Sequence, residues 1–171
     1  IHLTISNSRA EKMSDHKIIL YYTTLRDGTQ GVGLNLSVHD KVLIAKKLDE
    51  LKFDYIEGGW PGSNPKDIGF FEAICNTKLK YAKIVAFGST RRKGISAEDD
   101  ENIRALIKAN TPAVTIFGKS SVEHVRIALA TSLEENLNMI TDSVSYLRKQ
   151  GKEVVYDAEH FFDGFKLNQD Y

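Results

Sequence analysis

The sequence predicts an α/β protein built on a parallel β-sheet. Five short runs rich in apolar and β-branched residues alternate with segments of helical periodicity, in units of about 30 to 40 residues. No linker rich in proline, glycine or serine interrupts this alternation, so we expect one domain. Periodicity alone leaves open whether the sheet is doubly wound or part of a barrel. The predicted strands span residues 17–24, 53–58, 83–88, 113–118 and 153–158.

The first connection predicts a helix that begins at a capping box. Ser37 is followed three residues later by Asp40, which can complete this motif with a short acidic side chain. Ile44, Leu48 and Leu51 then recur on one helical face. We expect that face to pack on the sheet.

The second connection predicts a helix that starts at Asn64, because Pro65 suits the first helical position. The apolar residues from Phe70 to Ile74 should form its buried face. The single cysteine, Cys75, follows directly, so we expect a small buried side chain rather than a reactive thiol. One cysteine also excludes an internal disulfide, which fits a reducing cytoplasm.

The third connection repeats the capping pattern with Ser96 and Asp99, and its helix should end near Asn110, ahead of Pro112. The fourth connection is the longest. It contains a short segment at residues 122–130 and then a helix predicted to open at Thr131 with Glu134 and to end at Gly151. The apolar stripe predicted for this helix is Leu133, Leu137, Ile140, Val144 and Leu147.

Charge and hydropathy exclude two classes of partner. Lysine and arginine total 23 and aspartate and glutamate total 23, so no net charge draws the protein toward nucleic acid or anionic membranes. No apolar run approaches the about 20 residues that span a bilayer. We therefore expect small molecules or proteins as partners, and a cytoplasmic protein. Residues 1–16 are set aside as an N-terminal extension or tag.

Candidate site residues stand where the predicted strands end, since ligands of parallel α/β proteins gather there. Arg26 and Asp27 follow the first strand, Glu57 ends the second, and Asp157 and Glu159 end the fifth. A guanidinium can stabilise a developing enolate or alkoxide while a neighbouring carboxylate holds a divalent cation, which suits chemistry on a keto acid. An isolated Arg-Asp pair would equally fit a solvated loop.

Five segments resemble, in the same order, segments of a known enzyme family. The chain from residue 17 onward is similar to the metal-dependent acyl-CoA condensing enzymes that include citramalate, isopropylmalate and homocitrate synthases, and most similar to the (R)-citramalate branch. The resemblance implies a partial (β/α)8 barrel in which residues 17–171 are the N-terminal part of the catalytic domain, about the first five βα units of eight. The segments are TTLRDGTQ, IEGGWPGSNP, KIVAFGSTRR, TIFGKS and YDAEHFFDG.

The resemblance also implies roles for single residues. In that family the methyl carbon of acetyl-CoA adds to a 2-keto acid, here pyruvate, and the thioester is then hydrolysed. Arg26 would bind and polarise the keto oxygen, Asp27 would ligate a divalent cation (Mg, Mn or Zn), and Glu159 would act as a base or organise the enolate. A homo-oligomer is expected. The residues implied to line the keto-acid pocket are Gln30, Glu57 and Asp157.

Two departures from the family pattern matter. Tyr22 stands where the family usually has aspartate, which would remove a charge near Arg26. The family's His-x-His metal ligands have no counterpart among the five histidines of this sequence. Because one carboxylate cannot hold a divalent cation tightly, we expect the 171-residue chain alone to be nearly inactive unless another chain completes the barrel. Citramalate formation by the isolated chain would contradict this.

Other interpretations stay open at this point. The chain could belong to a 2-isopropylmalate or homocitrate synthase, to a lyase that runs the reverse cleavage, or to a non-catalytic half-barrel that pairs with itself or a partner. The cluster from Arg91 to Lys93 would either contact CoA phosphates or form a solvated loop. His160 would be a site residue or would orient Glu159. His39 and His124 are predicted to be surface residues.

Overall fold

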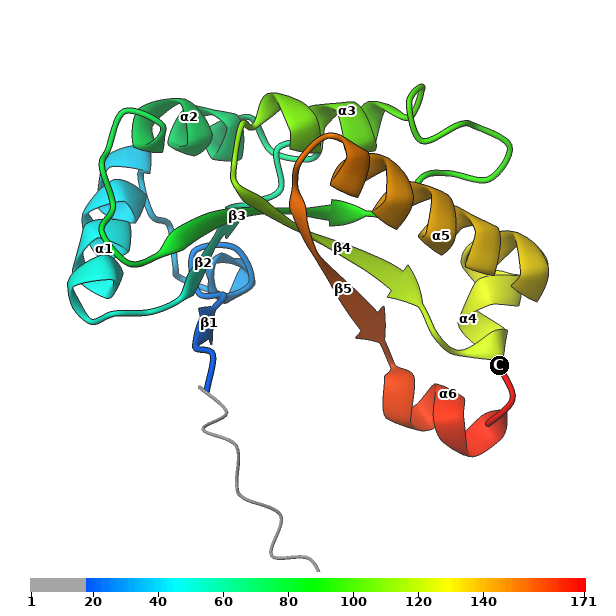
Figure 1. Ribbon diagram of the computed structural model, residues 1–171. Coiled ribbons are helices and arrows are strands. Elements are labelled where there is room, and N and C mark those ends of the chain that lie inside the picture. Colours follow the sequence, from blue (N-terminus) through cyan, green and yellow to red (C-terminus); the bar gives the residue numbers. More distant parts are fainter. Residues whose placement is uncertain (1–17) are drawn as a thin grey trace, which may run out of the picture.

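The computed structural model describes residues 18–171, and its five-stranded parallel sheet confirms the predicted class. The strands lie side by side in chain order, so each βα unit adds one strand to the same growing edge. Figure 1 shows the sheet curling, with α1, α2, α3 and α5 along the outside of the curl. The architecture is a half-barrel, the first part of a (β/α)8 barrel. The predicted extension at residues 1–16 lies outside the described residues.

The elements follow the predicted alternation of strands and helices. The strands are β1 (Tyr21–Tyr22), β2 (Tyr55–Gly59), β3 (Lys83–Ser89), β4 (Ala113–Lys119) and β5 (Glu153–Glu159). The helices are the 3₁₀ turn η1 (Gly28–Gln30), α1 (Val38–Glu50), α2 (Pro65–Ile74), α3 (Glu101–Lys108), α4 (Val122–Ile127), α5 (Leu133–Lys149) and α6 (Phe161–Leu167). Within residues 18–171, no helix has the length and apolar character required to cross a membrane.

Strand β1 is much shorter than the predicted strand 17–24, whose first residue lies outside the described part. The chain turns at Thr23, whose carbonyl oxygen accepts hydrogen bonds from the backbone N–H groups of Arg26 and Asp27. That turn ends pairing with β2 at Tyr22. The other four strands begin and end within one or two residues of their predicted limits.

Helices α1 and α2 begin as predicted, and the residue that follows each of them is exposed. The capping box of Ser37 and Asp40 is present, and the Asn64 side chain caps α2 ahead of Pro65. Leu51 was expected on the buried face of α1, but it is the C-cap and 60% exposed. Cys75 likewise caps the end of α2 and is exposed, so the prediction of a buried thiol is wrong.

Helix α3 starts later than predicted. Ser96 and Asp99 do form the expected side-chain contacts, but they close a separate turn before the helix. The cap of α3 is Asp100, which accepts hydrogen bonds from the backbone N–H groups of Asn102 and Ile103. The helix ends before Asn110, as predicted.

Helix α5 is capped by Ser132 instead of Thr131, and its buried face is rotated from the predicted stripe. Leu137 is 49% exposed, whereas the polar residues Asn136 and Ser143 are fully buried. They satisfy backbone groups of the sheet's carboxyl edge: Asn136 donates to the Lys119 carbonyl, and the Ser143 hydroxyl accepts from the Arg91 N–H. Part of the buried face of α5 is therefore polar, because Asn136 and Ser143 hydrogen-bond the chain at the ends of β4 and β3.

The two faces of the sheet differ because successive side chains of a strand point to opposite sides. The outer face is apolar and packs against the helices, with Phe70, Leu106 and Leu147 among the buried helix residues. The inner face carries polar, charged and aromatic side chains. Outer-face residues are Ile56, Ile84, Ala86, Val114, Ile116, Val154 and Tyr156. Inner-face residues with polar or aromatic contacts are Tyr21, Tyr55, Glu57, Phe87, Thr115, Phe117 and Lys119.

Two consecutive glycines at the end of β2 allow helix α2 to approach the sheet closely. A Cβ atom at Gly58 would lie 2.1 Å from the Phe70 ring, and one at Gly59 would lie 2.3 Å from the Asp67 carboxyl carbon. Asp67 in turn pairs with Lys41 of α1 at 2.5 Å, and Lys41 also donates to the Gly58 carbonyl at 3.1 Å. This buried ion pair fixes the loop that carries the carboxyl end of β2.

Candidate functional site

Arg26 lies at the carboxyl edge of the inner face and is held on three sides. Its Nε donates to Glu57 Oε1 at 2.6 Å, and its Nη1 donates to Asp27 Oδ1 at 2.9 Å. The guanidinium carbon lies 3.7 Å from the centroid of the Phe87 ring, a cation–π contact. The turn at Thr23 aims this side chain across the end of the sheet. Its Nη2 has no hydrogen-bond acceptor among the described residues.

Glu57 is the buried anchor of this arrangement. It is 1% exposed, and its second oxygen accepts a hydrogen bond from the Tyr21 hydroxyl at 2.6 Å. The Tyr21 hydroxyl also lies 2.5 Å from the Thr115 hydroxyl on β4. Burial raises the pKa of Glu57, although Tyr21 and Arg26 oppose the shift. Burial, with the nearby Glu57 charge, also raises the pKa of Tyr21. The tyrosine therefore stays a hydrogen-bond donor.

Asp157 lies within electrostatic reach of all the other charged groups at this edge. Partial burial raises its pKa, and the negative charges of Glu159 and Asp27 add to the effect. The positive charges of Arg26 and Lys119 oppose it. Four acids and two cations thus converge at one rim, from the turn after β1 and from the ends of β2, β4 and β5.

Five of the six predicted site residues share this rim, and their roles stay predictions. Gln30 does not join them, because it is exposed at the end of η1 and its side chain has no hydrogen bond to the rim. Tyr22 faces the opposite side of the sheet, where its ring packs edge-on against Phe53 at 5.3 Å. The residue that replaces the family's aspartate is therefore part of the apolar packing on the helix side. The five are Arg26, Asp27, Glu57, Asp157 and Glu159.

An aromatic cluster, which the sequence reasoning missed, forms the wall beside the charged rim. Phe87 and Phe117 stack at 5.5 Å, and Trp60 lies edge-on to both at 5.8 and 5.5 Å. The Trp60 Nε1 donates to Asn102 Oδ1 at 2.7 Å, which fixes the indole. Both phenylalanines precede a glycine near a strand end, and this repeated Phe-Gly pair is the signal that could have found them.

Lys119 is a second functional candidate without a role in the sequence reasoning. It ends β4 and forms an ion pair with Glu159 of β5, at the paired position Lys119–Glu159 of the two strands. Its Nζ lies 5.4 Å from the Phe117 ring centroid. The side chains of Lys119 and Glu159 are 21% and 31% exposed, so the pair is partly shielded but within reach of a ligand.

Arg91 fits neither of its two sequence interpretations. It is buried, and its guanidinium bonds to Glu135 at 2.8 Å and to Asp142 at 2.7 Å, which commits it to anchoring α5. Arg92 and Lys93 are exposed. They line a pocket of about 420 Å³ between the loop after β3 and the end of α4.

The histidines also differ from expectation at one position. His39 is exposed, as predicted, whereas His124 is half-buried and lies edge-on to His160 with ring centroids 4.4 Å apart. His160 itself adopts a left-handed conformation (φ 58°) between Glu159 and α6. Within residues 18–171, no three histidine, cysteine, aspartate or glutamate side chains form a cluster that could hold a metal ion.

Comparison with known proteins shows the family of this chain. The sequence family described as HMGL-like matches residues 17–165, which is most of the chain. The chain belongs to the HMGL-like family. It is 57% identical to the (R)-citramalate synthase of Geobacter sulfurreducens over 152 residues, which cover 89% of this chain and 29% of that protein. It is 34% identical to the 2-isopropylmalate synthase of Halalkalibacterium halodurans over 143 residues, which cover 84% and 27%.

Solved structures of other proteins share the fold. The HMG-CoA lyase of Bacillus subtilis superposes with a TM-score of 0.62 at 17% identity, over 82% of this chain and 45% of that one. At that identity the likeness concerns the fold alone. The chain spans about three-tenths of the length of the curated citramalate synthases it matches.

Proposed function

We propose that this chain is the first part of the catalytic domain of an enzyme that condenses acetyl-CoA with pyruvate to give citramalate. The observation that carries the proposal is the difference in identity: 57% to a citramalate synthase against 34% to a 2-isopropylmalate synthase, over similar lengths. Both relatives extend well beyond this chain, so the activity belongs to the longer protein.

Arg26 is the proposed electrophile for the keto group. A carbon–carbon bond to the keto carbon leaves an alkoxide, and a preorganised guanidinium stabilises that charge as it develops. Support comes from the contacts that leave Nη2 free while Glu57, Asp27 and Phe87 hold the rest of the group. Because its orientation is set before substrate arrives, little reorganisation accompanies the reaction.

Glu159 is the proposed base. Its carboxylate would accept a proton from the thioester methyl group, and the resulting enolate carbon would attack the keto carbon while the carbonyl electron pair moves to oxygen. Water would then hydrolyse the thioester and release CoA. Asp157 and Glu57, with Gln30 at the margin, would line the keto-acid pocket beside the aromatic wall.

A divalent cation would supply a Lewis acid for the ketone, and Asp27 is the ligand that this chain would contribute. The described residues hold no cluster of three or more suitable ligands, so they do not form a complete metal site by themselves.

The test is a chimaera in which residues 18–171 replace the aligned segment of the Geobacter sulfurreducens enzyme. Its products are analysed with acetyl-CoA and, in separate reactions, pyruvate, 2-oxoisovalerate and 2-oxoglutarate. We expect citramalate to dominate. Preferential formation of isopropylmalate or homocitrate would contradict the choice of substrate. Thioester release from a 3-hydroxyacyl-CoA, without condensation, would favour a lyase.

A further inference from the structure

Two cations, Arg26 and Lys119, lie at the carboxyl rim, and they differ in how many of their N–H donors already have an acceptor. Arg26 bonds to Glu57 and Asp27 and lies flat on Phe87. Lys119 has one ionic partner, Glu159, and its ammonium makes no other hydrogen bond within residues 18–171. An ammonium has three donors, so Lys119 keeps capacity for an acidic ligand.

A 2-keto acid presents two groups on adjacent carbons, a carbonyl oxygen and a carboxylate. One cation at the carbonyl leaves the carboxylate charge to be met, and a buried or half-buried carboxylate requires a hydrogen-bonded partner. Arg26 lies over the Phe87 ring, Lys119 lies 5.4 Å from the Phe117 ring, and these two rings stack at 5.5 Å, so both cations stand beside one aromatic pair. Phe117 supports Lys119 much as Phe87 supports Arg26.

We propose that Lys119 binds the carboxylate of the keto acid and that its ion pair with Glu159 breaks when it does so. This inference rests on the proposed function. In the free protein the Lys119 ammonium occupies a Glu159 oxygen. This ion pair engages one of the two carboxylate oxygens of Glu159 and holds the carboxylate against Lys119. When the substrate carboxylate takes over the ammonium, Glu159 is released as a base. Lys119 thereby links arrival of the keto acid to readiness of the base.

The chain contains a matched control for this pair. Lys83 and Glu153 form a second Lys–Glu ion pair on the inner face, with Nζ and Oε2 2.5 Å apart, at the amino ends of β3 and β5. Both ion pairs join a lysine to a glutamate of β5. Because the Lys83–Glu153 pair lies at the opposite edge from the rim, its loss should not affect substrate binding.

Binding is measured first on the 171-residue chain, whose single tryptophan, Trp60, belongs to the aromatic wall and packs edge-on against Phe117. Pyruvate is titrated against Trp60 fluorescence, with methyl pyruvate, which lacks the carboxylate charge, as the comparison ligand. We expect Lys119→Met to weaken pyruvate binding about 10- to 100-fold, as for loss of a charge-assisted contact. Lys119→Arg should restore most of it. Lys83→Met should bind like the parent.

The result that overturns the inference is equal pyruvate affinity in the parent and Lys119→Met, or no pyruvate binding by the folded parent. In the chimaera, Lys119→Met should raise KM for pyruvate about 10-fold or more and leave KM for acetyl-CoA within about twofold. If the chimaera is active and Lys119→Met leaves its KM for pyruvate unchanged, the inference about Lys119 is wrong and the proposed function stands. A chimaera that makes no citramalate defeats the proposed function, while the fluorescence titration still decides the role of Lys119.

Discussion

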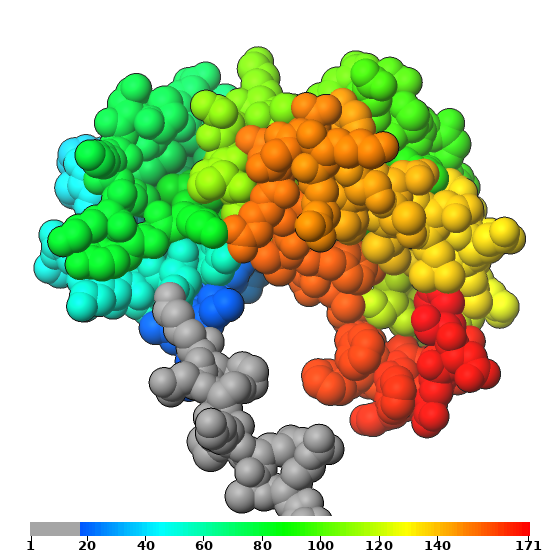
Figure 2. Space-filling view, in the orientation of Figure 1, coloured from blue at the N-terminus to red at the C-terminus, as the bar shows by residue number. Residues whose placement is uncertain are grey.

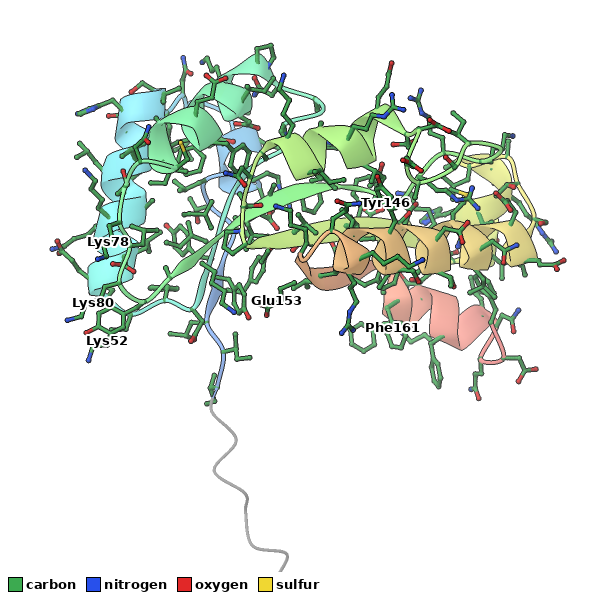
Figure 3. All side chains as sticks on the ribbon, turned by 45° about the horizontal axis from the view of Figure 1, so that its top comes forward. Lys52, Lys78, Lys80, Tyr146, Glu153 and Phe161 are labelled. Atoms are coloured by element: carbon green, nitrogen blue, oxygen red, sulfur yellow. The ribbon has the colours of Figure 1, made fainter. Side chains whose placement is uncertain are left out.

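The two ends of the inner face carry similar residues in different surroundings. The amino end holds Tyr55, Lys83 and Glu153, where both the tyrosine hydroxyl and the lysine donate to the glutamate. The carboxyl end repeats a Lys–Glu pair in Lys119 and Glu159. The amino-end pair is 49% and 43% exposed, and Figure 3 shows Glu153 at the margin of the sheet. The carboxyl-end pair is more shielded and is surrounded by further acids.

This difference appears in the direction of the pKa shifts. Hydrogen bonds from Lys83 and Tyr55 lower the pKa of Glu153, so its charge is favoured in the folded state. Burial instead raises the pKa of Glu57 and Asp157 at the carboxyl end. Folding therefore favours the charged form of Glu153 at the amino end, whereas burial disfavours the charged forms of Glu57 and Asp157 at the carboxyl end. Perturbed acids in a rim of convergent charges are typical of functional sites.

The largest expected effect is the loss of activity in Arg26→Lys, which tests the carboxyl end. A lysine keeps the charge but cannot donate to Glu57 and Asp27 and still present a free N–H in one plane. Citramalate formation by the chimaera should fall about 10²- to 10³-fold, with the free energy of unfolding little changed. Lys83→Arg is the control. A decrease smaller than about threefold would remove Arg26 from the mechanism.

The next effect is on stability and tests the amino end. Asp49 accepts three backbone N–H bonds, from Lys80, Tyr81 and Ala82 at 2.7 to 2.8 Å, just before β3. Burial alone would raise its pKa, but these donors lower it. Asp49→Ala should reduce the free energy of unfolding by about 3 kcal/mol, because three donors lose a charged acceptor. Urea unfolding measures this, and Figure 3 shows Lys80 in this region.

The neighbouring exposed residue provides the control for that prediction. Glu50 pairs only with Lys47 on the surface of α1, so Glu50→Ala should change the unfolding free energy by less than about 0.5 kcal/mol. Turnover per folded molecule of the Asp49→Ala chimaera should stay close to that of the parent. A selective loss of turnover would show that the amino end also takes part in catalysis.

A smaller effect concerns pH and has opposite signs at the two ends. With a raised pKa, folded Glu57 and Asp157 bind more protons than the unfolded chain just above their ordinary values of 4.5 and 3.8. Their contribution to stability therefore falls as pH rises through that window. Glu153 has a lowered pKa, so its contribution rises as pH increases toward 4.5.

Urea unfolding between about pH 3 and 7 separates the two contributions. Glu57→Gln combined with Asp157→Asn should remove the fall, and Glu153→Gln should remove the rise. If both variants change the pH profile in the same direction, the proposed division between the two ends is wrong.

The smallest effect is expected from Lys83→Met. Its ion pair with Glu153 is largely solvated, so stability should change by less than about 1 kcal/mol. The KM for pyruvate should be unchanged in the chimaera. A change of the size expected for Lys119→Met would show that any inner-face lysine has this effect.

The sequence was sufficient to predict that Arg26, Glu57 and Asp157 meet, because the carboxyl ends of parallel strands share one edge. It was not sufficient for Lys119 or the aromatic wall. Successive strand residues point to opposite faces, and the nearly continuous apolar runs of a parallel sheet do not show which set faces inward. The exposed position of Gln30 at the end of η1 was not predictable for a related reason, since η1 follows the turn at Thr23.

Element ends were also harder to predict than element types. Cys75 and Leu51 follow helical periodicity but lie at helix ends, where the chain turns away from the core. The rotation of α5 follows from Asn136 and Ser143 satisfying backbone groups near the rim, a tertiary interaction without a periodic signal. Polar helix residues therefore position the loops of the site.

Helix α6 projects from the body of the molecule, as Figure 2 shows for the segment coloured red-orange to red. Its exposed face carries Phe161, labelled in Figure 3, which stacks on Phe165 at 6.2 Å. The opposite face leaves no room at Gly164, where a Cβ atom would lie 2.3 Å from the Ser120 carbonyl oxygen. A larger residue at Gly164 would move the helix together with the adjoining ends of β4 and β5.

The buried pair of Lys41 and Asp67 has a consequence for how substrate preference could change. Asp67 accepts a hydrogen bond from the backbone N–H of Trp60 at 2.8 Å, and Lys41 donates one to the Gly58 carbonyl. Two helices behind the sheet therefore help to orient the Trp60 indole in front of it. Selection for a bulkier substrate could thus succeed through replacements on α1 that never meet the ligand. Side chains on the helix side of the sheet thus help to determine the shape of the pocket on its inner face.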